Sequence, residues 1–221
     1  MSSKNSLSAV DRFKLIVSQP KFQGWKRTSE FVTVFEIPYF GSVVRYTLET
    51  GNGTEVYFSL LRSFGWSVVF GVTADRELIS LAQYKPGVDC GSWELSPGGI
   101  GIINPGTSDE EILRKTQMIY LRETGYGNGS WSYLGNTMIE TGKYRGPRIT
   151  DHGLPAHMFL AMDLVKIQKA RNPNPDEIME TLMVPLREMR EVMESKLFKE
   201  TSAHSCAFEA LLKLGMLKWN E

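Results

Sequence analysis

The feature that most constrains the fold is a long helix with clear start and end signals, set between segments typical of β-strands. Ser108 followed three residues later by Glu111 fits a capping box, and Gly125 is a typical helix-stop glycine. Runs rich in β-forming residues precede this helix at 42–48, 55–60, 66–73 and 77–84, and others follow it at 131–138 and 156–165. Strands on both sides of a helix predict a mixed α+β domain.

Shorter elements complete the expected organisation. A short helix is predicted at 9–17, and helices are predicted at 185–198 and 202–214 because helix-forming residues dominate from 176 onward. Residues 74–76 are expected to form a tight turn between two strands of a buried sheet, whereas 141–155 and 172–175 are expected to be loops. The stretch 86–106 is dense in Gly and Pro.

Composition and charge exclude several classes of protein. The 221 residues include 25 Lys+Arg and 25 Asp+Glu, and 42% are hydrophobic, so the bulk of the chain is not disordered. General nucleic-acid binding is not expected, because it needs an excess of basic residues. Cys90 and Cys206 are expected to be free thiols, and no apolar run is long enough to span a membrane. These features predict a cytoplasmic protein without a membrane partner.

Three motifs carry a family resemblance. They are Gln83-Tyr84-Lys85, Glu94-Leu95-Ser96-Pro97-Gly98-Gly99 and Arg122-Glu123-Thr124-Gly125-Tyr126. In this order they resemble the ADP-ribose and nucleotide-sugar pyrophosphatase branch of the Nudix hydrolases, which shows Q-Y-R, E-L-P-A-G-G and R-E-L-x-E-E-T-G-Y. Further similarity at 157–164 and 176–186 extends the resemblance over about 32–214.

The resemblance implies the architecture and the assembly. We expect a Nudix-type α/β/α sandwich around a mixed sheet at 61–221, which would be an α/β (α+β) fold. Residues 1–60 would form an N-terminal strand-rich region that makes a homodimer, as is common in this branch.

The catalytic box of the family is degenerate in this chain. The family pattern is G, five residues, E, seven residues, then R-E-U-x-E-E-x-G-U, where U is a bulky apolar residue. Anchored on Gly125, it places Ile119 and Arg122 where two of the three clustered carboxylates should lie, and leaves only Glu123. Positions 119, 122 and 123 share one helix face, where carboxylates would hold Mg²⁺ or Mn²⁺. We therefore predict a crippled metal site.

Other residues are candidates to complete that site. If a metal binds, the candidates are Glu123, Glu110, Glu111 and the main-chain carbonyl of Pro97, and the candidate catalytic residues are Glu123, Glu110 and Asp151. Each has a structural alternative. Glu110 and Glu111 can serve the start of the helix, Glu123 can pair with Lys115 or Arg122, and Asp151 can be a solvated loop acid.

Ligand-binding candidates follow from charge, shape and backbone. Lys85, Arg122 and Arg145 can meet an anion, Gly98 and Gly99 offer backbone N–H groups, and Trp93 can form a flat wall. Trp66 and Trp131 lie in strand-like runs and are expected in the core.

Two functions from different classes remain open. The first is a degenerate Nudix protein that binds a nucleoside-diphosphate-linked or other phosphorylated ligand, or a partner protein, with little or no hydrolysis. The second is an active Mg²⁺- or Mn²⁺-dependent hydrolase of ADP-ribose-like pyrophosphates with a rearranged site. A third reading makes Arg122 an anion clamp for different chemistry in the same cleft.

Overall fold

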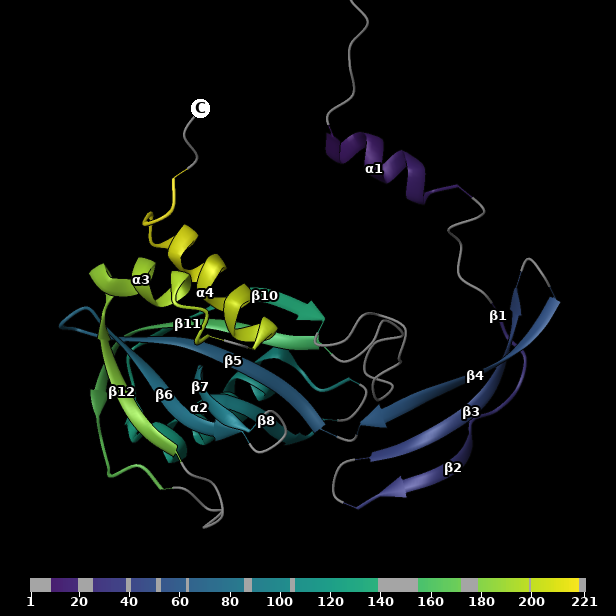
Figure 1. The fold of residues 1–221 in the computed structure, drawn as a ribbon, viewed down its shortest axis with the longest axis horizontal. Coiled ribbons are helices and arrows are strands. Elements are labelled where there is room, and N and C mark those ends of the chain that lie inside the picture. The colour runs from purple at the N-terminus through teal and green to yellow at the C-terminus, as the bar shows by residue number, and fades with distance from the viewer. Residues whose placement is uncertain are drawn as a thin grey trace, which may run out of the picture. The chain divides into compact units, whose positions relative to one another are not determined.

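The computed structural model describes residues 9–19, 26–38, 41–50, 53–62, 64–85, 89–103, 106–138, 155–171, 179–198 and 200–218 (Figure 1). Two candidate residues, Arg145 and Asp151, lie outside these ranges, as does most of the expected loop at 141–155. The chain forms two compact units. The first comprises Met1–Glu36 with Ser42–Ser59, and the second Ile37–Gly41 with Leu60–Glu221.

The first unit contains a helix and a small sheet. The predicted helix at 9–17 is confirmed as α1 (Ala9–Val17), and the strands are β1 (Lys26–Arg27), β2 (Val32–Ile37), β3 (Gly41–Thr50) and β4 (Gly53–Arg62). Strand β3 pairs with each of the other three strands. Its alternating sequence buries Val44, Tyr46 and Leu48, and the Phe31 ring meets Tyr46 edge-on at 5.1 Å.

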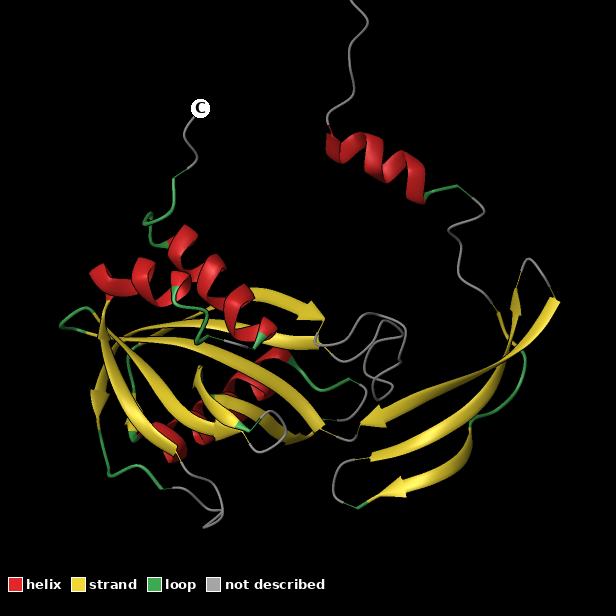
Figure 2. Ribbon diagram, in the orientation of Figure 1, coloured by secondary structure: helices red, strands yellow, loops and turns green. Residues whose placement is uncertain are grey.

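The second unit is built on a mixed sheet. Its main strands are β5 (Phe64–Thr73), β6 (Glu77–Lys85), β10 (Ser130–Met138), β11 (Pro155–Lys166) and β12 (Met179–Pro185), in the order β10-β11-β5-β6-β12. The shorter β7 (Cys90–Glu94) pairs with β6, β8 (Pro97–Ile102) with β5, and β9 (Tyr126–Gly127) with β11. Strands β5 and β11 are parallel and the other pairs are antiparallel, so the predicted mixed sheet is confirmed (Figure 2).

Helices cover both faces of this sheet. Helix α2 (Asp109–Thr124) lies on one face, whereas α3 (Met189–Glu194) and α4 (Thr201–Lys213) lie on the other (Figure 1). Side chains of β5 alternate between the two layers, since Val68 and Phe70 join the cluster with α3 and α4 while Val69 joins the cluster with α2. The predicted α/β/α sandwich is therefore confirmed. None of the described helices is long and apolar enough to cross a membrane.

The helix expected at 185–198 is shorter than predicted. After a 3₁₀ turn at Leu186–Glu188, α3 ends at Glu194. The hydroxyl of Ser195 donates to the carbonyl of Val192 and accepts from the N–H of Leu197, and Lys196 has a φ of 60°, which a right-handed helix does not allow. This turn leads Phe198 back to the sheet, where it is 1% exposed.

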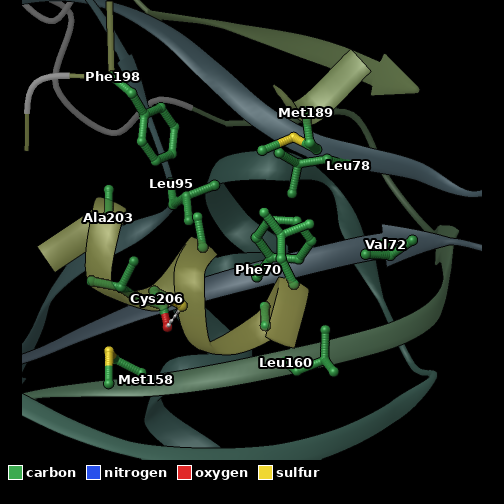
Figure 3. Packing of buried hydrophobic residues seen from close by; sticks show 14 of the residues in the cluster. Phe70, Val72, Leu78, Leu95, Met158, Leu160, Met189, Phe198, Ala203 and Cys206 are labelled. Atoms are coloured by element: carbon green, nitrogen blue, oxygen red, sulfur yellow. Dashed lines mark hydrogen bonds between the residues drawn. The ribbon is translucent and has the colours of Figure 1, made fainter. Parts of the chain in front are cut away.

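The core beneath α4 holds one of the two cysteines. Cys206 belongs to the buried cluster that also contains Phe70, Leu95 and Phe198, and its thiol lies 3.6 Å from the carbonyl oxygen of Val68 (Figure 3). Burial raises the pKa of this thiol to about 12. Neither cysteine forms a disulfide, as predicted, and Cys90 is only half-buried.

Thiol reactivity should separate the two cysteines. In the folded protein at pH 8 we expect a disulfide reagent such as dithiodipyridine to modify Cys90 within minutes and to leave Cys206 intact, because the thiolate is the reactive form. Both should react after unfolding in guanidinium chloride. Peptide mass mapping reads out each position, and rapid native modification of Cys206 would contradict the buried placement.

Candidate functional site

A cavity of about 290 Å³ is lined by residues of strands β5, β6, β7, β8 and β12, by one residue near the end of α2 and by the residue just before α4. We call it the acidic cavity, because three residues with carboxylate side chains line it. They are Glu94 of β7, Glu123 of α2 and Glu200, which immediately precedes α4. The remaining lining residues are Trp66, Leu81, Gln83, Leu95, Ser96, Gly98, Gly99 and Met179. The predicted candidates Glu123, Gly98 and Gly99 are thus brought together.

The ends of α2 place Glu123 at this cavity. The Ser108 side chain accepts a hydrogen bond from the N–H of Glu111, and Gly125 ends the helix at a φ of 79° with its N–H bonded to the carbonyl of Leu121. Thr116, Tyr120 and Thr124 are buried at a spacing of four, which fixes the face that meets the sheet. Glu123 therefore lies at the edge of the buried face, with a side chain 14% exposed.

A hydrogen bond ties this carboxylate to the sheet. The hydroxyl of Ser96 donates to Oε2 of Glu123 at 2.7 Å. Ser96 is itself fixed, because its carbonyl accepts the N–H of Val69 in β5 at 2.8 Å. The segment between β7 and β8 thus holds one oxygen of Glu123, and its other oxygen faces Arg122.

Arg122 lies beside this site without lining the cavity. Its Nη2 is 3.4 Å from Oε1 of Glu123, and its side chain is 42% exposed. Its Nε is buried with no hydrogen-bond partner in the described part of the chain. A contact this long and this exposed contributes little to stability, yet the positive charge offsets that of Glu123. Of the two pairings considered for Glu123, the contact with Arg122 is the one observed, since Lys115 pairs with Glu111 instead.

The other acids of α2 lie at its far end. Glu110 precedes Glu123 by thirteen residues, which corresponds to about 20 Å along a helix. A hydrogen bond with Ser108 lowers the pKa of Glu110, and Glu111 lies 3.6 Å from Lys115. Neither side chain can share an ion with Glu123. Both occupy the positions expected for acids that stabilise a helix start.

The remaining candidates are spread over the sheet. Lys85 ends β6 opposite Cys90, and Pro97 begins β8 opposite Val68. For Lys85 and Pro97 the structure describes the backbone and not the side chain. Trp93 lines a neighbouring cavity of about 530 Å³, and its Nε1 donates to the Ser80 hydroxyl at 2.8 Å.

Of the residues that line the acidic cavity, sequence reasoning named only Glu123, Gly98 and Gly99 as site candidates, and it missed Trp66, Glu94, Ser96 and Glu200. Trp66, expected in the core, pairs with Gly99 in the β5–β8 ladder, and its ring lies 3.5 Å from where a Cβ on Gly98 would be. Neither Trp66 nor Glu200 offered a local signal, because only the pairing of β5 with β8 brings Trp66 beside Gly98 and only the packing of α4 brings Glu200 to the cavity.

The donor set fits a hydrated cation better than a closed metal centre. Among the residues with described positions, no three His, Cys, Asp or Glu side chains lie close enough to hold one metal ion. Mg²⁺ commonly binds one or two carboxylates and takes its other ligands from water and substrate phosphates. Glu123, with Glu94 or Glu200 nearby, offers that kind of incomplete site.

Comparison with known proteins assigns the fold to a Nudix-like class. Neither a protein-family model nor a curated protein sequence matches the chain. Among solved structures 73 chains match. One is the crystal structure of an ADP compounds hydrolase, with a TM-score of 0.68 and 21% identity over 88% of this chain and 98% of that one. At this identity the likeness establishes a Nudix-like fold.

Proposed function

We propose that this chain is a Nudix-fold protein that binds a nucleoside-diphosphate-linked ligand in the acidic cavity, with hydrolysis lost or weak. One observation carries the proposal. Of the helix positions 119, 122 and 123, only Glu123 presents a carboxylate to the cavity, and its oxygens already meet Ser96 and Arg122. The likeness to an ADP compounds hydrolase supports the ligand class.

Charge makes a divalent cation part of this proposal. Glu94, Glu123 and Glu200 would repel a diphosphate unless a cation lay between them. Glu123 would hold Mg²⁺ or Mn²⁺ together with water and phosphate oxygens. When bound, such an ion neutralises the phosphates and activates water. Ile119 supplies no ligand and Arg122 adds a positive charge, so we expect weak binding of the ion.

Other residues have roles that follow from the same ligand. The ring of Trp66 offers a flat wall, and the backbone beside Gly98 and Gly99 can approach phosphate oxygens closely because no side chain intervenes. Lys85 and Arg145 remain proposed anion contacts, and Asp151 remains a proposed loop base.

A second function is favoured by one feature of the cavity. Glu94 and Glu200 bring carboxylates from outside α2 to the cavity that Glu123 also lines. In an active hydrolase one of these two residues, rather than Glu110 or Glu111, would share a partly hydrated cation with Glu123.

We also propose that the first unit forms a homodimer. Apolar side chains on β2 and β4 are more than half exposed within one chain, namely Val32, Val34, Phe35, Val56 and Phe58. A second copy would cover them.

Calorimetry with ADP-ribose tests the proposed function. We expect a component of binding that requires Mn²⁺, with release of AMP slow or absent by chromatography, and a loss of affinity of about tenfold or more for this component in Glu123→Gln. Glu111→Gln, the same change at the far end of α2, should bind as the unmodified chain does. Binding with no component that depends on Mn²⁺ and on Glu123 would contradict the proposal. Fast Mn²⁺-dependent AMP release that Glu123→Gln abolishes would favour the hydrolase instead.

A further inference from the structure

A second cavity lies at the opposite end of α2. It measures about 180 Å³ and is bounded by the first turn of α2 and by strands β10 and β11. The charged, polar and aromatic side chains that line it are those of Asp109, Glu110, Trp131, Tyr133, His157 and Phe159. We call it the aromatic cavity. It shares no lining residue with the acidic cavity, so an inference about it does not depend on the proposed function.

Flat side chains form its walls. Ring centroids lie 5.4 Å apart for Tyr133 and Phe159, and 6.1 Å apart for Tyr133 and His157. Trp131 meets Phe159 at 6.4 Å and is held by a hydrogen bond from its Nε1 to the carbonyl of Asn128. Such surfaces favour a planar ligand, and the volume limits it to a single ring system.

A hydrogen-bonded chain reaches one ring nitrogen of His157. The amide nitrogen of Asn136 donates to the Tyr133 hydroxyl oxygen at 3.3 Å, and this hydroxyl lies 3.3 Å from Nδ1 of His157, to which it can donate its own hydrogen. Burial lowers the pKa of His157, against a smaller opposing effect of Asp109, so the ring is neutral at pH 7. A neutral ring that accepts at Nδ1 carries its hydrogen on Nε2.

Carboxylates supply acceptors at the rim. Asp109 and Glu110 belong to the first turn of α2, where the helix dipole favours their charge. The hydrogen bond with Ser108 lowers the pKa of Glu110, so this carboxylate is ionised at pH 7. The cavity therefore combines flat walls, one imidazole donor and carboxylate acceptors.

We propose that the aromatic cavity binds a planar heteroaromatic ring that carries an amino group beside a ring nitrogen, as in an aminopurine or aminopyrimidine base. The ring packs against Tyr133 and Phe159. The ring nitrogen accepts from Nε2–H of His157, and the amino group donates to Asp109 or Glu110. A base with a carbonyl in place of the amino group reverses both hydrogen bonds and is rejected.

Adenosine and inosine test this arrangement, because they differ only at one edge of the base. Adenosine has an amino group beside a ring nitrogen that accepts, whereas inosine has a carbonyl group beside a ring N–H. Calorimetry without metal should show adenosine binding about tenfold or more tightly than inosine, the difference expected when buried donors and acceptors are left unpaired. His157→Phe keeps a flat ring and removes the donor, and it should lower adenosine affinity by about tenfold. Tyr133→Phe, which keeps the wall and frees Nδ1, should weaken the preference for adenosine over inosine. Tyr133→Phe also tests the proposal if the His157→Phe variant does not fold.

Controls separate this inference from the proposed function. Adenosine carries no phosphate and needs no Mn²⁺, so failure of ADP-ribose to bind at the acidic cavity leaves the result unchanged. Glu123→Gln should bind adenosine as the unmodified chain does. The inference is overturned if adenosine does not bind, if inosine binds equally well, or if Glu123→Gln rather than His157→Phe abolishes binding. Tetramethylammonium binding in place of adenosine would instead identify a cation site and also overturn it.

Discussion

The double variant Ile119→Glu/Arg122→Glu is expected to release AMP from ADP-ribose with Mn²⁺ at least about 100-fold faster than the unmodified chain. Positions 119, 122 and 123 are spaced i, i+3 and i+4 on α2, so their side chains lie on one face of the helix. The two changes would give Glu123 two neighbouring carboxylates and remove the guanidinium that lies 3.4 Å from it. A cation held by three carboxylates can then neutralise the diphosphate and activate water.

The same variant should show its metal site without any substrate. Three carboxylates on one helix face repel each other, so the variant should be less stable than the unmodified chain in the absence of metal. A ligand that binds only the folded state stabilises it, and millimolar Mn²⁺ should therefore raise the melting temperature of the variant much more than that of the unmodified chain. Calorimetric melting with and without Mn²⁺ measures this difference.

The matched control is Ile119→Gln/Arg122→Gln, which removes the same side chains without adding negative charge. It should gain neither hydrolysis nor Mn²⁺-dependent stability. Two results would contradict the inference that Ile119 and Arg122 are the cause of weak metal binding and weak hydrolysis. One is an unmodified chain that already releases AMP as fast as the double variant, and the other is a double variant that binds no Mn²⁺.

Local signals were sufficient where a segment's structure depends on its own sequence. The cap at Ser108 and the stop at Gly125 define α2, and the alternation in β5 separates the two core layers. The Gly- and Pro-rich stretch instead contains β7 and β8, which sequence patterns did not predict. Strand β8 has glycines at 98, 99 and 101, and it is a strand because it pairs with β5.

The candidate site was predictable in part for the same reason. Glu123 follows from the spacing within one helix, which a sequence displays directly. Glu200 and Trp66 reach the acidic cavity through the packing of α4 and the pairing of β5 with β8, and no local pattern encodes either contact. The prediction of a helix over 185–198 was wrong at its end, because α3 ends at Glu194 and Lys196 adopts a positive φ. Amino-acid composition does not predict this conformation.

Gly71→Ala is expected to lower the free energy of unfolding by about 3 kcal/mol, at the upper end of the cost of overpacking a core. Gly71 lies in β5 directly beneath α2. A Cβ there would overlap the hydroxyl of Tyr120 and lie 2.7 Å from its Cζ and 2.9 Å from Cδ1 of Leu164. The Tyr120 side chain is fully buried, so it has no space to move into.

This contact also sets the depth of α2 on the sheet, and thereby the position of Glu123 relative to Ser96. If α2 shifts outward to accommodate the methyl group, the 2.7 Å hydrogen bond between those two residues is stretched. Gly71→Ala should therefore weaken Mn²⁺-dependent binding of ADP-ribose as well as stability. Urea denaturation and calorimetry measure the two effects in one sample.

Two further variants separate this cause from a general intolerance of alanine in strands. Gly91→Ala in β7 places a Cβ where nothing lies within 4 Å and should change stability by less than about 0.5 kcal/mol. In a Tyr120→Leu background, which removes the atoms that a new Cβ would meet first, Gly71→Ala should cost well under half of its effect in the unmodified chain. Equal costs for Gly71→Ala with and without the Tyr120 ring would show that something other than this contact fixes the helix, and with it Glu123, over the sheet.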